Sequence, residues 1–197
     1  AATYAHPPQR DWEADSDLPK EARQRGCIDI ARQMVEGAVG SQIDVILGGG
    51  RANFLPSNVR DSEYPDSHGK RSDRRDLIAE WRKRNPDGAY VWNSVAFAKV
   101  DLASTPRLLG LFEPDHMHYE ADRAQDAGGE PSLAEMTRAA ITMLGSREKG
   151  YVLLVEGGRI DHAHHAGNAR RALEDTIALD DAVKAALAMT SRQDTLI

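Results

Sequence analysis

One run of this chain combines residue types and a spacing that could hold a metal ion. An apolar segment, residues 152–155, ends at the carboxylate of Glu156, and a glycine pair follows as a turn. Asp161 and His165 then stand at positions i and i+4, so on a helix they would share one face. Carboxylates and imidazoles are ordinary ligands of first-row metals, and a mixed Asp/His set suits zinc. The run therefore indicates half of a metal-binding catalytic site.

Other candidate groups have simpler explanations when each is taken alone. The glycine triplet at 48–50 could cradle phosphate, but it matches no nucleotide-binding fingerprint and is better explained as a structural turn. His162 and His164 more often face solvent or stand behind the ligands. No Gly-x-Ser-x-Gly elbow or Cys/His nucleophile signature is present. Three acidic residues stand in or beside loops, where such residues are typically solvated: Glu63, Glu113 and Glu130. Only a hard cation such as calcium would gather them.

Composition limits the classes of protein to consider. The chain has 197 residues, 41% hydrophobic and 28% charged, which is ordinary for one globular domain or part of a larger one. Its net charge of −6 argues against a nucleic-acid-binding surface, and no apolar stretch approaches the roughly 20 residues that span a bilayer. No signal peptide is visible, and because Ala1 is not an initiator methionine, we expect the start to be processed, cut or left out.

Apolar periodicity and capping signals predict alternating strands and helices. Ser132, followed three residues later by Glu135, forms a Ser-x-x-Glu capping box before one predicted helix. Polar stretches at 56–76 and 116–129 lack periodicity and are predicted to be long excursions, which in compact domains are usually functional or disordered. The predicted helices are 20–39, 77–84, 132–144 and 169–189, and the predicted strands are 43–47, 90–92, 108–112 and 151–155.

This alternation predicts an α/β fold of three layers, α/β/α, with a largely parallel sheet. In such sheets functional residues gather at the carboxyl ends of strands. Glu156 would lie at one of these ends, directly after the strand predicted at 151–155.

Several motifs along this chain resemble those of a known family. Residues 156–165 (EGGRIDHAHH) are similar to the metal-site motif of alkaline phosphatases, in the form shared by animal and many bacterial enzymes. The resemblance covers nearly the whole chain and implies an alkaline-phosphatase-like fold. The other motifs in the family's order are TYAHPPQR at 3–10, GCIDIA at 26–31, DVILGGGR at 44–51, EYP at 63–65, YVWN at 90–93, LGLFEP at 109–114 and PSLAEM at 131–136.

The resemblance implies a phosphomonoester hydrolase that holds two zinc ions and one magnesium ion. By motif, Asp161 and His165 resemble ligands of the first zinc, and Glu156 resembles a magnesium ligand. Arg10 resembles the arginine that holds the substrate phosphate, a task that suits a planar, bidentate guanidinium. The family's calcium site is matched by Glu63, the carbonyl of Phe112, Glu113 and Glu130, with Glu130 standing where an aspartate is usual.

The resemblance also implies functional groups outside this sequence. In the family, the serine that forms the phosphoserine intermediate precedes the stretch seen here, and ligands of the second zinc follow it. Residues 1–197 are therefore expected to be an internal segment of one catalytic domain, inactive alone, with a metal-binding excursion at about 56–130. Cys27, the single cysteine, matches one that is disulfide-bonded in animal members, with its partner upstream. Family members are usually exported homodimers that act on phosphomonoesters.

Two other classes of protein stay open at this stage. One is a related metalloenzyme of the same superfamily, a sulfatase or a phosphate-transferring mutase. The nucleophile before Ala1 would discriminate, because a serine suits a phosphatase and a modified cysteine suits a sulfatase. The other is a non-catalytic calcium-binding module, built from Glu63, Phe112, Glu113 and Glu130.

Overall fold

The computed structural model describes residues 3–197 of the chain. These residues form two compact units. The first unit contains the residues up to Tyr90 together with Arg107–His116, and the second contains Val91–Pro106 and Met117–Ile197. Between residues 3 and 197, no helix is both long and apolar enough to cross a membrane.

The first unit is built on a three-stranded sheet of order β1-β3-β2. Its strands are β1 (Val45–Gly48), β3 (Leu108–Leu111) and β2 (Ala89–Val91). β1 and β3 run parallel, with Val45 opposite Leu108. Each strand overlaps a predicted one, and the α/β class is confirmed.

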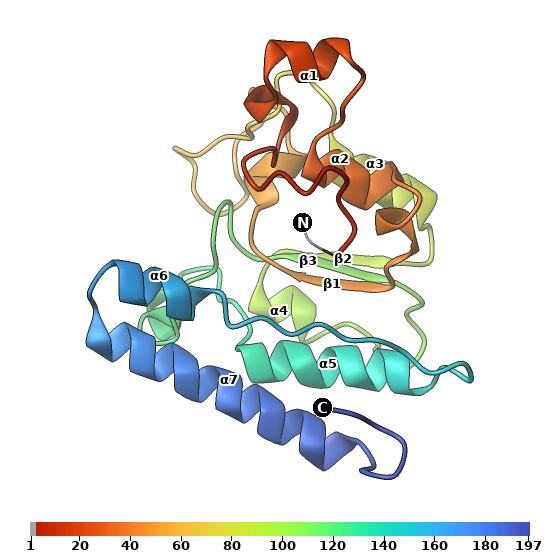
Figure 1. Cartoon of the computed structure of the whole chain (residues 1–197), viewed down its shortest axis with the longest axis vertical. Coiled ribbons are helices and arrows are strands. Elements are labelled where there is room, and N and C mark those ends of the chain that lie inside the picture. The colour runs from red at the N-terminus through yellow and green to blue at the C-terminus, as the bar shows by residue number, and fades with distance from the viewer. Residues whose placement is uncertain (1–2) are drawn as a thin grey trace. The chain divides into compact units, whose positions relative to one another are not determined.

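Helices α2 (Ile30–Glu36) and α3 (Leu77–Arg84) pack on this sheet (Figure 1). α3 begins where predicted, because the side chain of its N-cap residue Asp76 accepts a hydrogen bond from the Ala79 N–H at 2.9 Å. The core fixes the end of β3, after which Phe112 and Glu113 follow. Its buried residues are Ala31, Val35, Phe54, Leu55, Leu77, Ile78, Trp81, Leu109 and Leu111.

The prediction of one helix over 20–39 is wrong. The structure has α1 (Lys20–Gln24) and, after a break, α2. Gly26 adopts a left-handed φ of 80°, which ends the first helix. Asp29 starts the second, because its side chain accepts a hydrogen bond from the Arg32 N–H at 2.8 Å. The apolar periodicity continues across both helices and so concealed the break.

The second unit is mainly helical. It contains α4 (Ser94–Phe97), α5 (Leu133–Gly145), α6 (Arg159–His165) and α7 (Ala169–Met189), and α7 packs against both α5 and α6. The predicted capping box is present, since Ser132 accepts from the Glu135 N–H at 3.2 Å and Glu135 accepts from the Ser132 N–H at 2.8 Å. The helices predicted at 132–144 and 169–189 are confirmed by α5 and α7. The short helix α4 was not predicted.

Short 3-10 helices complete the regular structure of the two units. They are η1 (Asp15–Asp17), η2 (Gly40–Gln42), η3 (Arg51–Phe54) and η4 (Arg123–Gln125).

The prediction of a strand at 151–155 is wrong for the described residues. The segment has no assigned strand, and within residues 3–197 no strand pairs with it. Its side chains still alternate, with Val152 96% and Leu154 70% exposed while their neighbours are half-buried. The apolar residues of this run suit a strand, but a strand also needs a neighbouring strand that pairs with its backbone hydrogen-bonding groups.

Candidate metal centre

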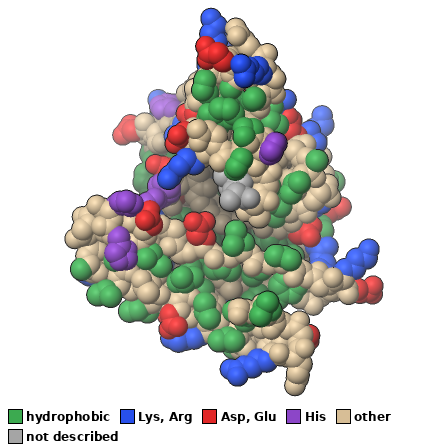
Figure 2. Space-filling model, viewed as in Figure 1, with side chains coloured by type: hydrophobic (Ala, Val, Ile, Leu, Met, Phe, Trp, Pro, Cys, Tyr) green, Lys and Arg blue, Asp and Glu red, His purple; other side chains and the backbone are tan. Residues whose placement is uncertain are grey.

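Asp161 and His165 lie together on α6, as their spacing predicts. The His165 Nε2 atom is 3.4 Å from Asp161 Oδ1, and the two side chains are 81% and 74% exposed respectively. Figure 2 shows histidine side chains at the surface over α6. An exposed carboxylate and imidazole one helical turn apart are a fitting donor set for zinc. His164 is also exposed, whereas His162 is half-buried and its Nδ1 lies 3.0 Å from an Arg159 nitrogen.

Glu156 stands on the extended segment just before α6, separated from it by the glycine pair. The Glu156 side chain is exposed. At Gly157, a Cβ atom would lie 3.0 Å from Ile160 Cδ1 and 3.4 Å from Leu179 Cβ. A side chain at this position would crowd both α6 and α7. The turn between the carboxylate and the Asp161/His165 pair thus packs closely, and a side chain at Gly157 would require Ile160 to shift.

Tyr119 anchors α6 and α7 to the loop that precedes η4. The guanidinium of Arg159, at the start of α6, lies 3.8 Å from the centre of the Tyr119 ring, and that of Arg171, on α7, lies 4.4 Å from it. Arg171 also pairs with Asp122 at 2.7 Å. Each cation–π contact contributes about 0.5–2 kcal/mol, so the ring helps to orient the helix that carries Asp161.

Three of the predicted calcium ligands lie in the first unit. Phe112 and Glu113 follow β3 directly and are buried, and the side chain of Glu63, in the excursion, is only 4% exposed. The carboxylate oxygens of Glu63 and Glu113 lie within 4.8 Å of one another. Two buried carboxylates repel each other unless a positive charge lies beside them, and the assignment of calcium to these residues stays a prediction.

Arg51 lies at the centre of this arrangement. Its Nε and Nη2 atoms donate to the two carboxylate oxygens of Asp61 at 2.8 and 2.7 Å. Its Nη1 donates to the Leu111 carbonyl at 2.8 Å, and its Nη2 donates to Glu63 Oε2 at 3.4 Å. The side chain is completely buried, so these contacts replace the water that a guanidinium would otherwise bind.

The glycine triplet at 48–50 serves as a turn into this network. Gly50 adopts a left-handed φ of 86°, and its N–H donates to the Asp115 carbonyl at 2.6 Å. The Arg51 N–H donates to the Glu113 carbonyl at 2.8 Å. These N–H groups hold the chain segment after β3, which supports the structural interpretation of the triplet over a phosphate cradle.

Burial alone would raise the pKa of Asp61, but its hydrogen bonds outweigh that effect. Arg51 and the N–H groups of Glu63 and Tyr64 donate to the carboxylate, and the pKa of Asp61 is lowered as a result. The pKa of Asp73 is lowered in the same way, since its hydrogen bonds, chiefly from Arg71, outweigh burial. Both groups favour the ionised form more strongly in the folded chain than in the unfolded chain.

These lowered pKa values predict an acid-sensitive first unit. An aspartate has a pKa of about 3.9 when unfolded, so the stability from Asp61 and Asp73 is complete only above about pH 5. It is lost as the pH falls through the lower pKa values of the folded chain. Urea unfolding, followed by tryptophan fluorescence between about pH 5 and pH 2, should show this decline. The Asp61→Asn variant should show a shallower decline, and an unchanged slope would contradict the assignment.

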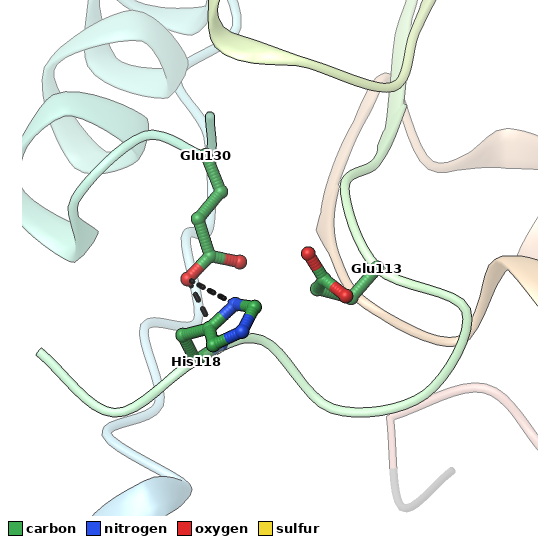
Figure 3. A group of neighbouring side chains, drawn as sticks. All are labelled: Glu113, His118 and Glu130. Carbon is green, nitrogen blue, oxygen red and sulfur yellow. Dashed lines mark hydrogen bonds and ion pairs between the residues drawn. The ribbon is translucent and has the colours of Figure 1, made fainter. Parts of the chain in front are cut away.

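Glu130, the fourth predicted calcium residue, lies in the second unit and is buried. Its Oε1 accepts a hydrogen bond from the His118 N–H at 2.8 Å and lies 3.7 Å from His118 Nδ1 (Figure 3). The glutamate follows Gly129, where φ is 73° and a Cβ atom would lie 2.3 Å from Ser94 Oγ. These contacts hold the glutamate side chain, which is longer than the aspartate usual at this position in the family, within its unit. Its assembly with the residues of the first unit stays a prediction.

Arg10 and Cys27 both belong to the first unit. Arg10 is exposed in a turn that the Trp12 N–H closes on the Gln9 carbonyl at 3.1 Å. Its predicted contact with substrate phosphate, like the metal assignments, stays a prediction. Cys27 is half-buried and lines a cavity of about 560 Å³ together with Asp29 and Arg32, and its disulfide bond to a cysteine upstream stays a prediction.

Sequence reasoning missed the residues that support the predicted ligands. Asp61 stands in a polar stretch, where charged residues usually face solvent, whereas Arg51 lies between the glycine turn and the apolar residues Phe54 and Leu55. Tyr119 and His118 lie in an excursion without periodicity. Of these residues, only Arg51 had a local sequence signal of a structural role, because it directly follows the glycine turn.

Comparison with known proteins points to one family along the whole chain. The family model described as alkaline phosphatase matches residues 1–197. The chain is 45% identical over 202 residues to the tissue-nonspecific alkaline phosphatase of Gallus gallus, covering 100% of this chain and 38% of that protein. It is 43% identical to an alkaline phosphatase of Gadus morhua, covering 100% of this chain and 41% of that one.

Solved structures give the same result at the level of the fold. The Thermus thermophilus alkaline phosphatase superposes with a TM-score of 0.66 at 34% identity, covering 81% of this chain and 29% of that one. A mutant of the TAB5 alkaline phosphatase with Mg bound in its M3 site gives 0.55 at 23% identity, covering 74% and 36%.

Proposed function

Because this chain belongs to the alkaline phosphatase family, we propose that it is an internal segment of an enzyme that hydrolyses phosphate monoesters. The observation that carries the proposal is the family match over residues 1–197. The exposed Asp161/His165 pair on α6 supports it, since these residues carry the family's metal-site motif. The chain covers 38% of the length of the Gallus gallus relative, so the activity belongs to the proposal for a longer protein.

The proposed metal ligands follow the motifs and the donor chemistry. Asp161 and His165 would hold zinc, and Glu156 would hold magnesium, the ion bound in the M3 site of the TAB5 alkaline phosphatase mutant. The calcium residues are Glu63, the carbonyl of Phe112, Glu113 and Glu130. Zinc held by Asp161 and His165 would supply positive charge that stabilises oxygens in a displacement at phosphorus.

The chain's own residues would bind and orient the substrate. The exposed Arg10 guanidinium would hold two phosphate oxygens, which fixes the phosphorus for attack and offsets charge that develops on those oxygens. Glu156 would order the site and would not attack the substrate. The nucleophile in this proposal is a serine that the family carries outside the aligned stretch.

Related assignments belong to the same proposal. Export and a homodimeric assembly follow from family analogy alone. A sulfatase, a phosphomutase and an isolated calcium module are not favoured, because the matched relatives are named alkaline phosphatases along the full chain.

The proposal is tested by the release of p-nitrophenol from p-nitrophenyl phosphate by the full-length protein. We expect hydrolysis at alkaline pH, its loss after chelation, and its recovery when zinc and magnesium are restored. The 197-residue chain alone should be inactive. Failure of the metal-loaded full-length protein to hydrolyse the ester would contradict the proposal, and faster cleavage of p-nitrophenyl sulfate would favour a sulfatase.

A further inference from the structure

Arg51 connects separate chain segments that carry the proposed calcium ligands of the first unit. Its guanidinium grips Asp61 through both carboxylate oxygens, at 2.8 and 2.7 Å, and also reaches Glu63 at 3.4 Å. It binds the Leu111 carbonyl at 2.8 Å, one residue before Phe112. Its own N–H donates to the carbonyl of Glu113 at 2.8 Å. The buried side chain of Arg51 thus touches Glu63 and the residue before Phe112, and its backbone N–H touches Glu113.

Asp61 links Arg51 to the residues that carry the ligand side chains. Its Oδ1 accepts hydrogen bonds from the N–H groups of Glu63 at 2.9 Å and Tyr64 at 3.2 Å. The Tyr64 hydroxyl then donates to Glu113 Oε1 at 3.4 Å. The path from Arg51 through Asp61 and Tyr64 therefore returns to the second carboxylate of the pair.

We propose that Arg51 is the positioning residue of the calcium site. The inference rests on the proposed function, which places calcium at Glu63, Phe112 and Glu113. Arg51 is not a ligand itself, because a guanidinium carries a positive charge and no acceptor lone pair. Through its planar fork onto Asp61, which lysine cannot reproduce, and through its contact with Glu63, it holds the two ligand carboxylates at the separation that a cation can bridge.

Charge and geometry make opposite predictions for this residue. As a charge alone, Arg51 would repel calcium, so a neutral residue would strengthen calcium binding and lysine would leave it unchanged. As a positioning residue, Arg51 is needed for its fork, so lysine should weaken binding although the charge is kept. The Arg51→Lys variant separates these two roles.

The experiment is a calcium titration of the full-length protein by calorimetry, with the free energy of unfolding measured in the absence of calcium. We expect Arg51→Lys to weaken calcium binding by about 10–100-fold, the range measured when the partner behind a metal ligand is removed. The matched control is Arg71→Lys. Arg71 is also completely buried and forked onto an aspartate, Asp29, but it contacts no proposed ligand among the described residues. That variant should lose stability and keep its calcium affinity.

The outcomes separate this inference from the proposals on which it rests. Wild-type calcium affinity in Arg51→Lys, or an equal loss in Arg71→Lys, would overturn the positioning role. Unchanged affinity in Glu113→Gln would overturn the calcium site and the inference with it, while p-nitrophenyl phosphate hydrolysis would still decide the phosphatase proposal. If Arg51→Lys does not fold, Asp61→Asn tests the same path, and an unchanged affinity there would also overturn the role.

Discussion

Replacing Asp161 by asparagine is expected to lower kcat/KM for p-nitrophenyl phosphate by at least about a hundredfold in the full-length protein. Removal of a group behind a metal ligand already costs about 10–100-fold, and the loss of a ligand should cost more. Asparagine keeps the size of the side chain but removes the negative charge that zinc would bind. The measurement pairs steady-state kinetics with the zinc content of the purified protein.

The exposure of Asp161 makes this result interpretable. The pair formed by Asp161 and His165 is 74% and 81% exposed at the respective side chains, and exposed ion pairs stabilise a fold by only about 0–1 kcal/mol. The metal-free variant should therefore unfold at nearly the same urea concentration as the metal-free wild type. Asp180→Asn, which breaks an exposed pair with Lys184 on α7, is the control and should keep its activity and zinc. A fully active, zinc-loaded Asp161→Asn protein would remove this residue from the site.

Elements with local signals were predictable from the sequence. α3 begins at the Asp76 cap, and α5 begins at the capping box of Ser132 and Glu135. The signals for both helices lie within a few residues of one another in sequence, so no knowledge of the fold is needed to read them. The same holds for the Asp161/His165 pair, whose spacing of one helical turn fixes its geometry.

Elements that depend on distant partners were not predictable in the same way. The segment at 151–155 has the composition of a strand, but pairing is a property of two segments and cannot be read from one. The break after α1 was missed for a different reason. Gly26 and the Asp29 cap outweigh a periodicity that continues through both helices.

The support for the proposed calcium residues also depends on distant contacts. Arg51 reaches Asp61 ten residues away and Leu111 sixty residues away. Sequence patterns treat charged residues in a polar stretch as solvated, which is the more common case. Here a completely buried arginine pairs with Asp61 of the excursion, beside the apolar core that contains Phe54 and Leu55.

Arg71 is a second buried arginine, at the other end of the excursion, that is also paired with aspartates. It is completely buried and donates to both Asp29 oxygens at 2.9 and 3.0 Å, to the Asn53 carbonyl at 3.2 Å and to Asp73 at 2.6 Å. These contacts tie the excursion to the start of α2 and to η3. A stretch with little apolar surface is thus ordered by buried ion pairs, whose loss should be costly.

Replacing Asp29 by alanine is therefore expected to lower the free energy of unfolding by about 3–5 kcal/mol. The variant loses the cap of α2, worth about 1 kcal/mol, and two charge-assisted hydrogen bonds of the buried Arg71, worth about 1.5–3 kcal/mol each, while Asp73 stays paired with that arginine. That loss is a large fraction of the roughly 5–15 kcal/mol that stabilises a typical domain. Urea unfolding of the full-length protein, followed by tryptophan fluorescence, measures it.

Asp76→Ala separates the cost of the cap from the cost of the buried charge. Asp76 caps α3 by accepting from the Ala79 N–H at 2.9 Å through a solvent-exposed hydrogen bond, so its loss should cost only about 1 kcal/mol. The double variant Asp29→Ala with Arg71→Leu should recover part of the stability, because the buried guanidinium that has lost one of its two aspartate partners is then removed as well. Equal losses in the two single aspartate variants would mean that the ion pair contributes nothing beyond the cap. The excursion would then have to be held by its backbone hydrogen bonds, such as that from Ser57 to the Arg71 carbonyl at 2.9 Å.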